Sequence, residues 1–168
     1  MPRQLLRDGR IVVDDWTYLS EAGAAAAPAS VDSSNAIILT FDQWLSDEPG
    51  WRTAPHRLGV ILSPIDKVEK LAPELARFDL VGAEFPGPSE GRGYTQGRLL
   101  RERYGWRGEL RATGYVRRDQ VFFLARCGFN SFELPESDLP AAAGAFSTFT
   151  ARYQPANDLG LALKLQHR

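Results

Sequence analysis

The sequence is poor in the residues that bind metals and redox centres. It has one cysteine (Cys127) and two histidines (His56 and His167) in 168 residues. A single cysteine excludes an intrachain disulfide, a paired-thiol redox motif and a multi-cysteine iron–sulfur site. Neither histidine has a second ligand at metal-binding spacing. We therefore expect no bound metal and no cofactor.

The chain also lacks a strong net charge and any long hydrophobic run. Its formal net charge is −1 at pH 7, which argues against nucleic acid as an electrostatic partner. No apolar run approaches the roughly 20 residues of a membrane span, and the first ten residues lack the apolar core of a signal peptide. We expect a soluble, cytoplasmic protein with no membrane partner. Hydrophobic residues make up 43% of the chain, enough for a folded core.

From residue 58 onward, short apolar segments alternate with helical patterns. The predicted strands are 58–63, 80–85, 109–114 and 131–134, and the predicted helices are 68–78, 95–104, 118–127 and 138–153. Pro73 should bend or split the first helix, and Cys127 should be a packing residue at the end of the third. Short βα connections favour adjacent parallel strands. The sequence predicts an α/β fold of four to five parallel βα units, as a half barrel of the TIM type or as an open doubly wound sheet.

The N-terminal part predicts a β-hairpin, with Asp8 and Gly9 as its turn. We expect one domain over residues 1–168, with a hairpin arm (1–21), a low-complexity loop (22–35), the βα core (36–155) and a C-terminal tail (156–168). A half barrel leaves an open edge and an uncovered concave face. We expect the hairpin, the long loops or a partner chain to cover that face, and we predict a homo-oligomer.

Lysine is scarce, and the arginines are clustered. Only three of the twenty basic residues are lysine, and nine arginines fall between residues 92 and 126. The cluster begins in the glycine-rich stretch SEGRGYTQGR (89–98), which follows a predicted strand and matches neither a P-loop nor a dinucleotide fingerprint. The stretch is either an ordinary glycine-rich turn before a helix or an anion-binding loop.

The loop after the next strand, 114–120, occupies the equivalent position. In parallel α/β folds such loops meet at the carboxyl ends of the strands, where ligands bind. We predict an anion-binding or partner-binding rim there. Its candidate residues are Arg92, Tyr94, Arg98, Arg117, Arg118 and Gln120.

Alternation along the strands places three charged residues on the face opposite the helices. These residues are Glu84, Arg111 and Glu133, one from each of three consecutive strands. If strand order follows sequence order, the arginine stands between two carboxylates, and we expect these groups to pair. One interpretation is a buried salt-bridge triad; the other is the floor of a pocket with a glutamate available for proton transfer or metal binding. These three residues are weak catalytic candidates.

The chain resembles a known bacterial family over nearly its whole length. The series GRGYTQGRLLRERYGWRGELRATGYVRRDQ, followed by RCGF, is similar to the domain-of-unknown-function 934 family, and RQLLRDGRIVVDDW, Trp44 and LGVIL fit its N-terminal part. The resemblance implies an association with assimilatory sulfite reduction, in which members carry the label of oxidoreductase. Two positions depart from the family pattern. Glu90 stands where the family has Asp, and Tyr115 stands in place of an Asp, which puts an acid–base role of that loop in doubt.

Three functions are compatible with these features. The first is a non-catalytic accessory protein of sulfur assimilation that presents the arginine rim to a small oxyanion, a phosphosulfate nucleotide or an acidic patch of sulfite reductase or another enzyme of the process. The second is an enzyme acting on a small anionic metabolite. The third is a structural homo-oligomer whose arginines serve the interface.

Overall fold

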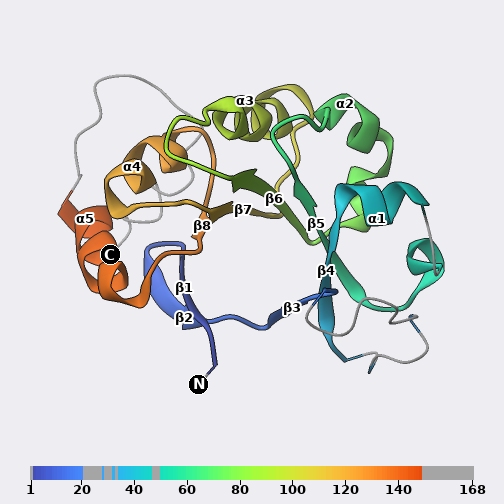
Figure 1. Ribbon diagram of the computed structural model, residues 1–168, viewed down its shortest axis with the longest axis horizontal. Coiled ribbons are helices and arrows are strands. Elements are labelled where there is room, and N and C mark those ends of the chain that lie inside the picture. The colour runs from blue at the N-terminus through green and yellow to red at the C-terminus, as the bar shows by residue number, and fades with distance from the viewer. Residues whose placement is uncertain (1, 21–27, 29–31, 33, 47–49, 149–168) are drawn as a thin grey trace.

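The computed structural model describes residues 2–20, 28, 32, 34–46 and 50–148, which form an α/β fold around one sheet of eight strands (Figure 1). The strands are β1 (Gln4–Arg7), β2 (Arg10–Val13), β3 (Trp16–Tyr18), β4 (Ala36–Thr40), β5 (Arg57–Leu62), β6 (Leu80–Phe85), β7 (Glu109–Gly114) and β8 (Ser131–Phe132). The helices are α1 (Phe41–Ser46), α2 (Val68–Leu71), α3 (Arg92–Arg98), α4 (Arg118–Arg126) and α5 (Leu139–Thr148). Shorter turns are the 3₁₀ segments η2 (Trp51–Thr53), η3 (Ala72–Arg77) and η5 (Glu136–Asp138) and the π-helical turn η4 (Leu99–Arg103).

The strand order is β2-β1-β8-β7-β6-β5-β4-β3. Strands β3 to β8 run parallel to one another and stand in sequence order, as successive βα units of one hand require. The helices lie along the outer, convex side of the curled sheet (Figure 1). The predicted α/β class is confirmed, and of its two forms the structure adopts the half barrel.

The predicted N-terminal hairpin is present and belongs to the same sheet. β1 and β2 pair antiparallel around a turn at Asp8 and Gly9, whose φ angles are 51° and 77°. Positive φ at both turn positions is the geometry that matches the twist of a two-residue hairpin. β1 also pairs antiparallel with β8, so the hairpin extends the sheet beyond its last parallel strand.

The two edges of the sheet are close together in the sequence. β2 ends at Val13 and β3 begins at Trp16, although these strands lie at opposite edges of the sheet. Asp14 and Asp15 alone connect them, so the sheet must curl until its edges approach each other (Figure 1). The side chain of Asp14 in this connection and that of Tyr18 in β3 reach polar groups of β7. The N-terminal segment therefore lies over part of the concave face that a half barrel leaves open.

Alternation along the strands separates a large apolar layer from a smaller, mixed one. In β6 and β7, Val81, Ala83, Leu110 and Ala112 are buried in the main hydrophobic cluster together with helix residues such as Leu124. The cluster on the other face consists of Trp16, Ala36, Ile38, Ile61 and Leu80, with Tyr18 packed against it. This smaller cluster leaves room for polar side chains on the concave face of β7.

The boundaries of two helices differ from those that the sequence predicts. The first predicted helix splits before Pro73, where α2 ends and η3 follows. α3 begins at Arg92 instead of Thr95, with Gly91 as its N-cap residue, and the Glu90 carboxylate just before the helix accepts a hydrogen bond from the Arg92 amide (2.9 Å). The predicted extension of the last helix beyond residue 148, the C-terminal tail (156–168) and most of the loop 22–35 lie outside the described residues.

Candidate functional site

Arg111 of β7 is a fully buried charged side chain on the concave face. Its guanidinium donates five hydrogen bonds: two to Asp14 (2.9 and 3.0 Å), two to Glu109 (2.9 and 3.2 Å) and one to Glu133 (3.1 Å). A guanidinium has five N–H donors. Every donor of Arg111 therefore has a carboxylate acceptor.

Asp14 is the partner of Arg111 that the sequence analysis missed. Its side chain is 1% exposed, and it also pairs with Arg3 at 2.9 Å. Asp14 lies in the connection between β2 and β3, so only the curling of the sheet brings it to Arg111. The sequence shows two adjacent aspartates after a strand, which is an ordinary turn pattern and carries no signal for such a contact.

Glu133 continues the cluster toward β3. The Tyr18 hydroxyl donates to one carboxylate oxygen of Glu133 (2.6 Å), and the Thr113 hydroxyl donates to the other (2.8 Å). Burial and the charge of Glu133 raise the pKa of Tyr18, so its hydroxyl is protonated at neutral pH and acts as a donor. Glu133 is thus held by three side chains from two strands.

The charges of this cluster balance. The carboxylates of Asp14, Glu109 and Glu133 face the guanidinium groups of Arg3, Arg7 and Arg111. Burial works against the charge of Arg111, but its bonds to Asp14 and the neighbouring carboxylates outweigh burial and raise its pKa. A buried charge is tolerated when it is paired and hydrogen-bonded. The arrangement favours a structural role, in which the cluster fastens the N-terminal segment to the parallel strands.

Glu84 was expected beside Arg111, and that expectation is wrong. The strand register aligns Arg111 with Gly82 and Thr113 with Glu84. Glu84 therefore lies two residues, or roughly 7 Å, further toward the carboxyl end of its strand. The Glu84 side chain is exposed and has no hydrogen-bond or ion-pair partner among the described residues. Of the predicted triad, only the pair of Arg111 and Glu133 is present.

The glycine-rich loop ends on an ion pair between Glu90 and Arg92. The Nε and Nη2 groups of Arg92 donate to the two carboxylate oxygens of Glu90 at 2.9 and 2.7 Å. These bonds lower the pKa of Glu90 to about 2, so the pair is charged at neutral pH. The Nη1 group of Arg92 has no acceptor among the described residues and is available to a ligand.

A cavity of about 460 Å³ lies beside this ion pair, between the loop after β5 and the first turns of α3. Its polar lining includes Asp66, Lys67, Glu69, Arg92, Thr95 and Gln96. The cavity stands at the carboxyl end of the parallel strands, where ligands bind in folds of this class. The residues that line this cavity thus include two cations (Lys67 and Arg92), one hydroxyl (Thr95) and two carboxylates (Asp66 and Glu69).

Gln96 connects α3 to the opposite wall of this cavity. The side chain is 5% exposed, and its Nε2 group donates to the carbonyl oxygens of Ser63 (2.8 Å) and Asp66 (3.0 Å). Its Oε1 atom is buried and has no partner among the described residues. A buried acceptor without a donor costs free energy. A ligand with an N–H or O–H group would satisfy it.

Three of the predicted rim residues meet at the start of α4. The Gln120 side chain hydrogen-bonds the Tyr94 hydroxyl and also accepts a bond from the Arg117 amide (2.9 Å). The Arg117 guanidinium stacks on the Tyr115 ring, 4.8 Å from its centroid. Tyr115 thus forms a cation–π contact with Arg117.

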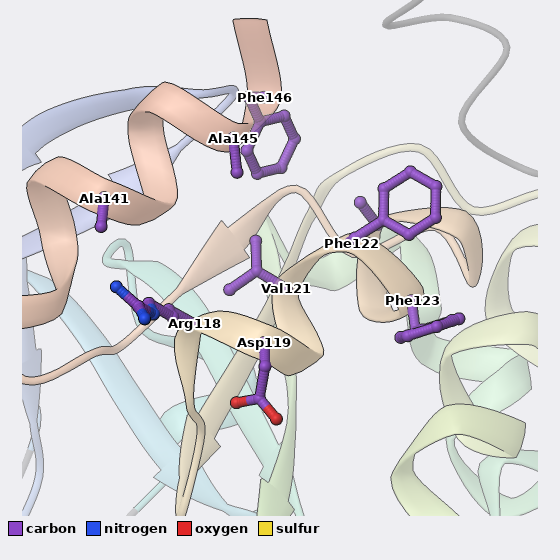
Figure 2. A pocket seen from close by; sticks show the side chains of 9 residues that line it. Arg118, Asp119, Val121, Phe122, Phe123, Ala141, Ala145 and Phe146 are labelled. Carbon is purple, nitrogen blue, oxygen red and sulfur yellow. The ribbon is translucent and has the colours of Figure 1, made fainter. Parts of the chain in front are cut away.

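The other rim residues lie apart from one another. Arg118 lines a second cavity, between α4 and α5 (Figure 2), whereas Arg92 lines the first. Arg98 is the last residue of α3 and pairs with Glu102 at 3.4 Å on an exposed surface. The structure does not bring all six residues to one hollow, and a binding role for each of them stays a prediction.

Not every arginine of the cluster between residues 92 and 126 faces solvent. Arg101 is 8% exposed and donates to the carbonyl oxygens of Gly128 (3.0 Å), Trp106 (2.8 Å) and Gly108 (3.0 Å). Burial, and then the charge of Arg107, lower its pKa to about 10, so it is cationic at neutral pH. Arg101 and Arg111 stabilise the interior, and counting arginines in the sequence overstated the charge of the rim.

The described residues contain no group of three or more His, Cys, Asp or Glu side chains arranged to hold a metal ion. No helix in the described part of the chain is both long and apolar enough to cross a bilayer. Cys127 is half-buried at the C-terminal end of α4, and burial raises the pKa of its thiol.

These features define a half-barrel α/β protein with a buried arginine cluster on its concave face and a cavity of mixed polar and apolar lining at the carboxyl ends of its strands. Residues 59–163 match the family described as bacterial protein of unknown function, DUF934. The protein belongs to this family. Among curated proteins, none matches the chain significantly. The matched region contains Glu109, Arg111 and Glu133, whereas Asp14 precedes it.

Proposed function

We propose that this protein is an accessory protein of sulfite reduction that binds a small oxyanion, or a carboxylate of a partner enzyme, in the cavity beside Arg92. The observation that carries the proposal is the cavity between the loop after β5 and α3, with Arg92, Lys67 and Thr95 in its lining. The association of the family with sulfite reduction supports sulfite as the anion and a sulfite reductase as the partner.

The ion pair with Glu90 supports Arg92 as the anion-binding group. Glu90 occupies one edge of the guanidinium through Nε and Nη2, which orients the side chain and leaves Nη1 for a ligand. An arginine held in this way loses less side-chain entropy on binding than a free one. Lys67 adds a second charge from the opposite wall of the cavity.

Gln96 favours an oxyanion that carries a proton. Its Oε1 atom is buried and has no partner among the described residues, so after a rotation of the side chain toward the cavity it would accept a hydrogen bond and repel a bare anionic oxygen. Bisulfite and hydrogen phosphate have an O–H group to donate, whereas sulfate at neutral pH has none. The proposed site should therefore prefer bisulfite or phosphate to sulfate.

The Arg111 cluster does not favour the enzyme alternative. Glu133 is its most exposed carboxylate, at 18% of the side chain, and already accepts bonds from Arg111, Tyr18 and Thr113. Three of the four acceptor sites of this carboxylate hold structural side chains, and one on Oε2 is left for a substrate's proton. The proposal of a binding protein rests on the cavity and requires no catalytic group.

Thermal-shift and calorimetric titrations with sulfite, phosphate, sulfate and adenosine phosphosulfate test the proposal. Millimolar sulfite should raise the melting temperature of the wild type, and sulfate should have a smaller effect. Arg92→Ala should abolish the shift with little change in the melting temperature of the free protein. Arg103→Ala is the matched control, because Arg103 is exposed and stacks on Tyr104 away from the cavity.

The partner is tested by affinity capture from the native bacterium with the same variants. Wild type and Arg103→Ala should retain a sulfite reductase or another enzyme of the process, and Arg92→Ala should lose it. The proposal would be overturned if the anions produced no thermal shift and no enzyme were captured in a way that depends on Arg92. Unfolding of Arg92→Ala would show that the residue is structural.

A further inference from the structure

The outward face of α4 carries two phenylalanines. Phe123 is 61% exposed, and Phe122 is partly exposed beside it, with the two rings in edge contact at 5.6 Å between centroids. Figure 2 shows Asp119 and Phe123 projecting from the side of α4 that faces away from α5. Exposed aromatic residues next to one another are typical of an interaction surface.

Charged residues flank this aromatic pair symmetrically along the helix. Asp119 lies in the first turn of α4 and Arg126 in the last, three residues outside the pair on either side. Positions separated by three, four and seven residues share one face of a helix. Asp119, the aromatic pair and Arg126 therefore form one stripe, acidic at its start and basic at its end.

The second cavity, an apolar groove, adjoins this stripe. It lies between α4 and α5, has a volume of about 570 Å³ and is lined mainly by Val121, Phe122, Phe123, Ala141, Ala145 and Phe146. Figure 2 shows Val121 of α4 facing Ala145 and Phe146 of α5 across it. This surface thus carries both the projecting side chain of Phe123 and the apolar groove between α4 and α5.

We propose that this surface binds a second copy of the chain, with the two α4 helices antiparallel across a twofold axis. A twofold interface must be complementary to itself. When the axis passes between Phe122 and Phe123, each Phe122 lies opposite Phe123 of the partner subunit. In the same register Asp119 lies opposite Arg126 of the partner subunit, at both ends of the contact. One arrangement therefore pairs every member of the stripe.

Partners of another kind fit this stripe less well. A ligand of one charge would match one end of α4 and be repelled at the other, because the acidic and basic residues are about 10 Å apart along the helix. A second copy of α4 reverses this order of charges when it runs antiparallel. A nine-residue helix is too short to bury the roughly 800 Å² per subunit of a standard interface. The groove and the adjoining face of α5 therefore belong to the contact.

Sedimentation equilibrium of the full chain between 1 and 100 µM tests the dimer and its register. The wild type should be dimeric, and Phe123→Ser should shift the protein to monomer at all these concentrations. Ile65→Ser is the matched control, because Ile65 is 77% exposed and lies on the loop after β5, and it should leave the dimer unchanged.

A charge exchange separates this pairing from an effect on folding. Asp119→Arg alone and Arg126→Asp alone should each weaken dimerisation at least tenfold, since each places like charges opposite one another. The double variant should restore the dimer. Each substitution places a charge at a helix end where the helix dipole disfavours it, so the double variant should have a less stable monomer than the wild type. Restored association in a less stable chain cannot arise from folding alone.

Three results would overturn the proposal. The first is a wild type that is monomeric at 100 µM, as expected if the chain fills the groove with its own residues. The second is a dimer that Phe123→Ser leaves intact. The third is a double variant that dimerises no more tightly than either single variant. The anion-binding proposal is independent of these results, because Arg92 and its cavity lie outside the stripe.

Discussion

The guanidinium of Arg111 lies 2.9 Å from a carboxylate oxygen of Asp14, a residue 97 positions earlier in the chain. This contact joins the two-residue connection between the sheet edges to the middle of the parallel sheet. Both side chains are almost fully buried. The pair therefore joins the connection between the sheet edges to the buried charge cluster around Arg111.

We expect Arg111→Met to destabilise the protein by about 3–5 kcal/mol, because it leaves Asp14 and Glu133 as buried charges without their partner. Urea denaturation followed by circular dichroism measures the loss. Arg107→Met is the control and should change stability by less than about 0.5 kcal/mol, since Arg107 is exposed. Equal stability of the two variants would show that the cluster contributes nothing to folding.

Asp14→Asn should loosen the N-terminal segment selectively. The amide keeps the size of the side chain but removes the charge that Arg111 and Arg3 share. The loss should be about 1.5–3 kcal/mol, as for hydrogen bonds to charged groups. Hydrogen exchange should accelerate in β1, β2 and β3 more than in β5 and β6. Uniform acceleration across the sheet would contradict a fastening role.

The carboxyl of Glu90 should titrate at a pH near 2, because the Arg92 side chain and amide bond its charged form. Since this pKa lies below the ordinary value of 4.5, the ion pair adds stability above about pH 4.5 and loses it as the pH falls toward 2. The contribution is small because the pair is exposed. Carbon-detected NMR should follow the titration. Arg92→Ala should return it to the ordinary range, and a normal pKa in the wild type would disprove the pair.

Gly114→Ala should be much more harmful than Gly105→Ala. Both glycines have positive φ (85° and 62°), which costs alanine about 1 kcal/mol. A Cβ atom at Gly114 would also lie 2.5 Å from the backbone oxygen of Phe85, whereas one at Gly105 would meet nothing within 4 Å. Thermal unfolding should show a loss of about 1 kcal/mol for Gly105→Ala and at least about 2 kcal/mol for Gly114→Ala. Similar losses would mean that the backbone at β7 adjusts freely.

Cys127 should react slowly with alkylating reagents at neutral pH. Burial raises the pKa of its thiol above the ordinary value of 9.0, so the thiolate is scarce until the pH exceeds that value. The alkylation rate should rise at a higher pH than for a free thiol, and urea should abolish the difference. Fast labelling of the folded chain at pH 7 would contradict this environment.

The sequence alone determined the α/β class, the succession of βα units from residue 58 onward and the N-terminal hairpin. Period-two apolar segments, short βα connections and the Asp8–Gly9 turn are local signals, and local backbone preferences decide what they form. The alternation in 80–85 and 109–114 also indicated which residues face the helices, and the structure confirms it for Val81 and Leu110. The α/β class and the hairpin were predictable for this reason, whereas the choice of the half barrel over an open sheet was left to the tertiary structure.

The partners across the sheet were decided by the tertiary structure alone. Glu84 and Arg111 share a face, but the register offsets them by two residues, and no local signal in the sequence specifies that offset. Asp14 reaches Arg111 only because the sheet of eight strands curls until its two edges approach each other. Arg101 and Arg92 look alike in the sequence, yet one is buried against carbonyl oxygens and the other lines a cavity. Burial and pairing of charges depend on the packing of the whole chain, because the cost of a buried charge is set by its partners in space and not by its neighbours in sequence.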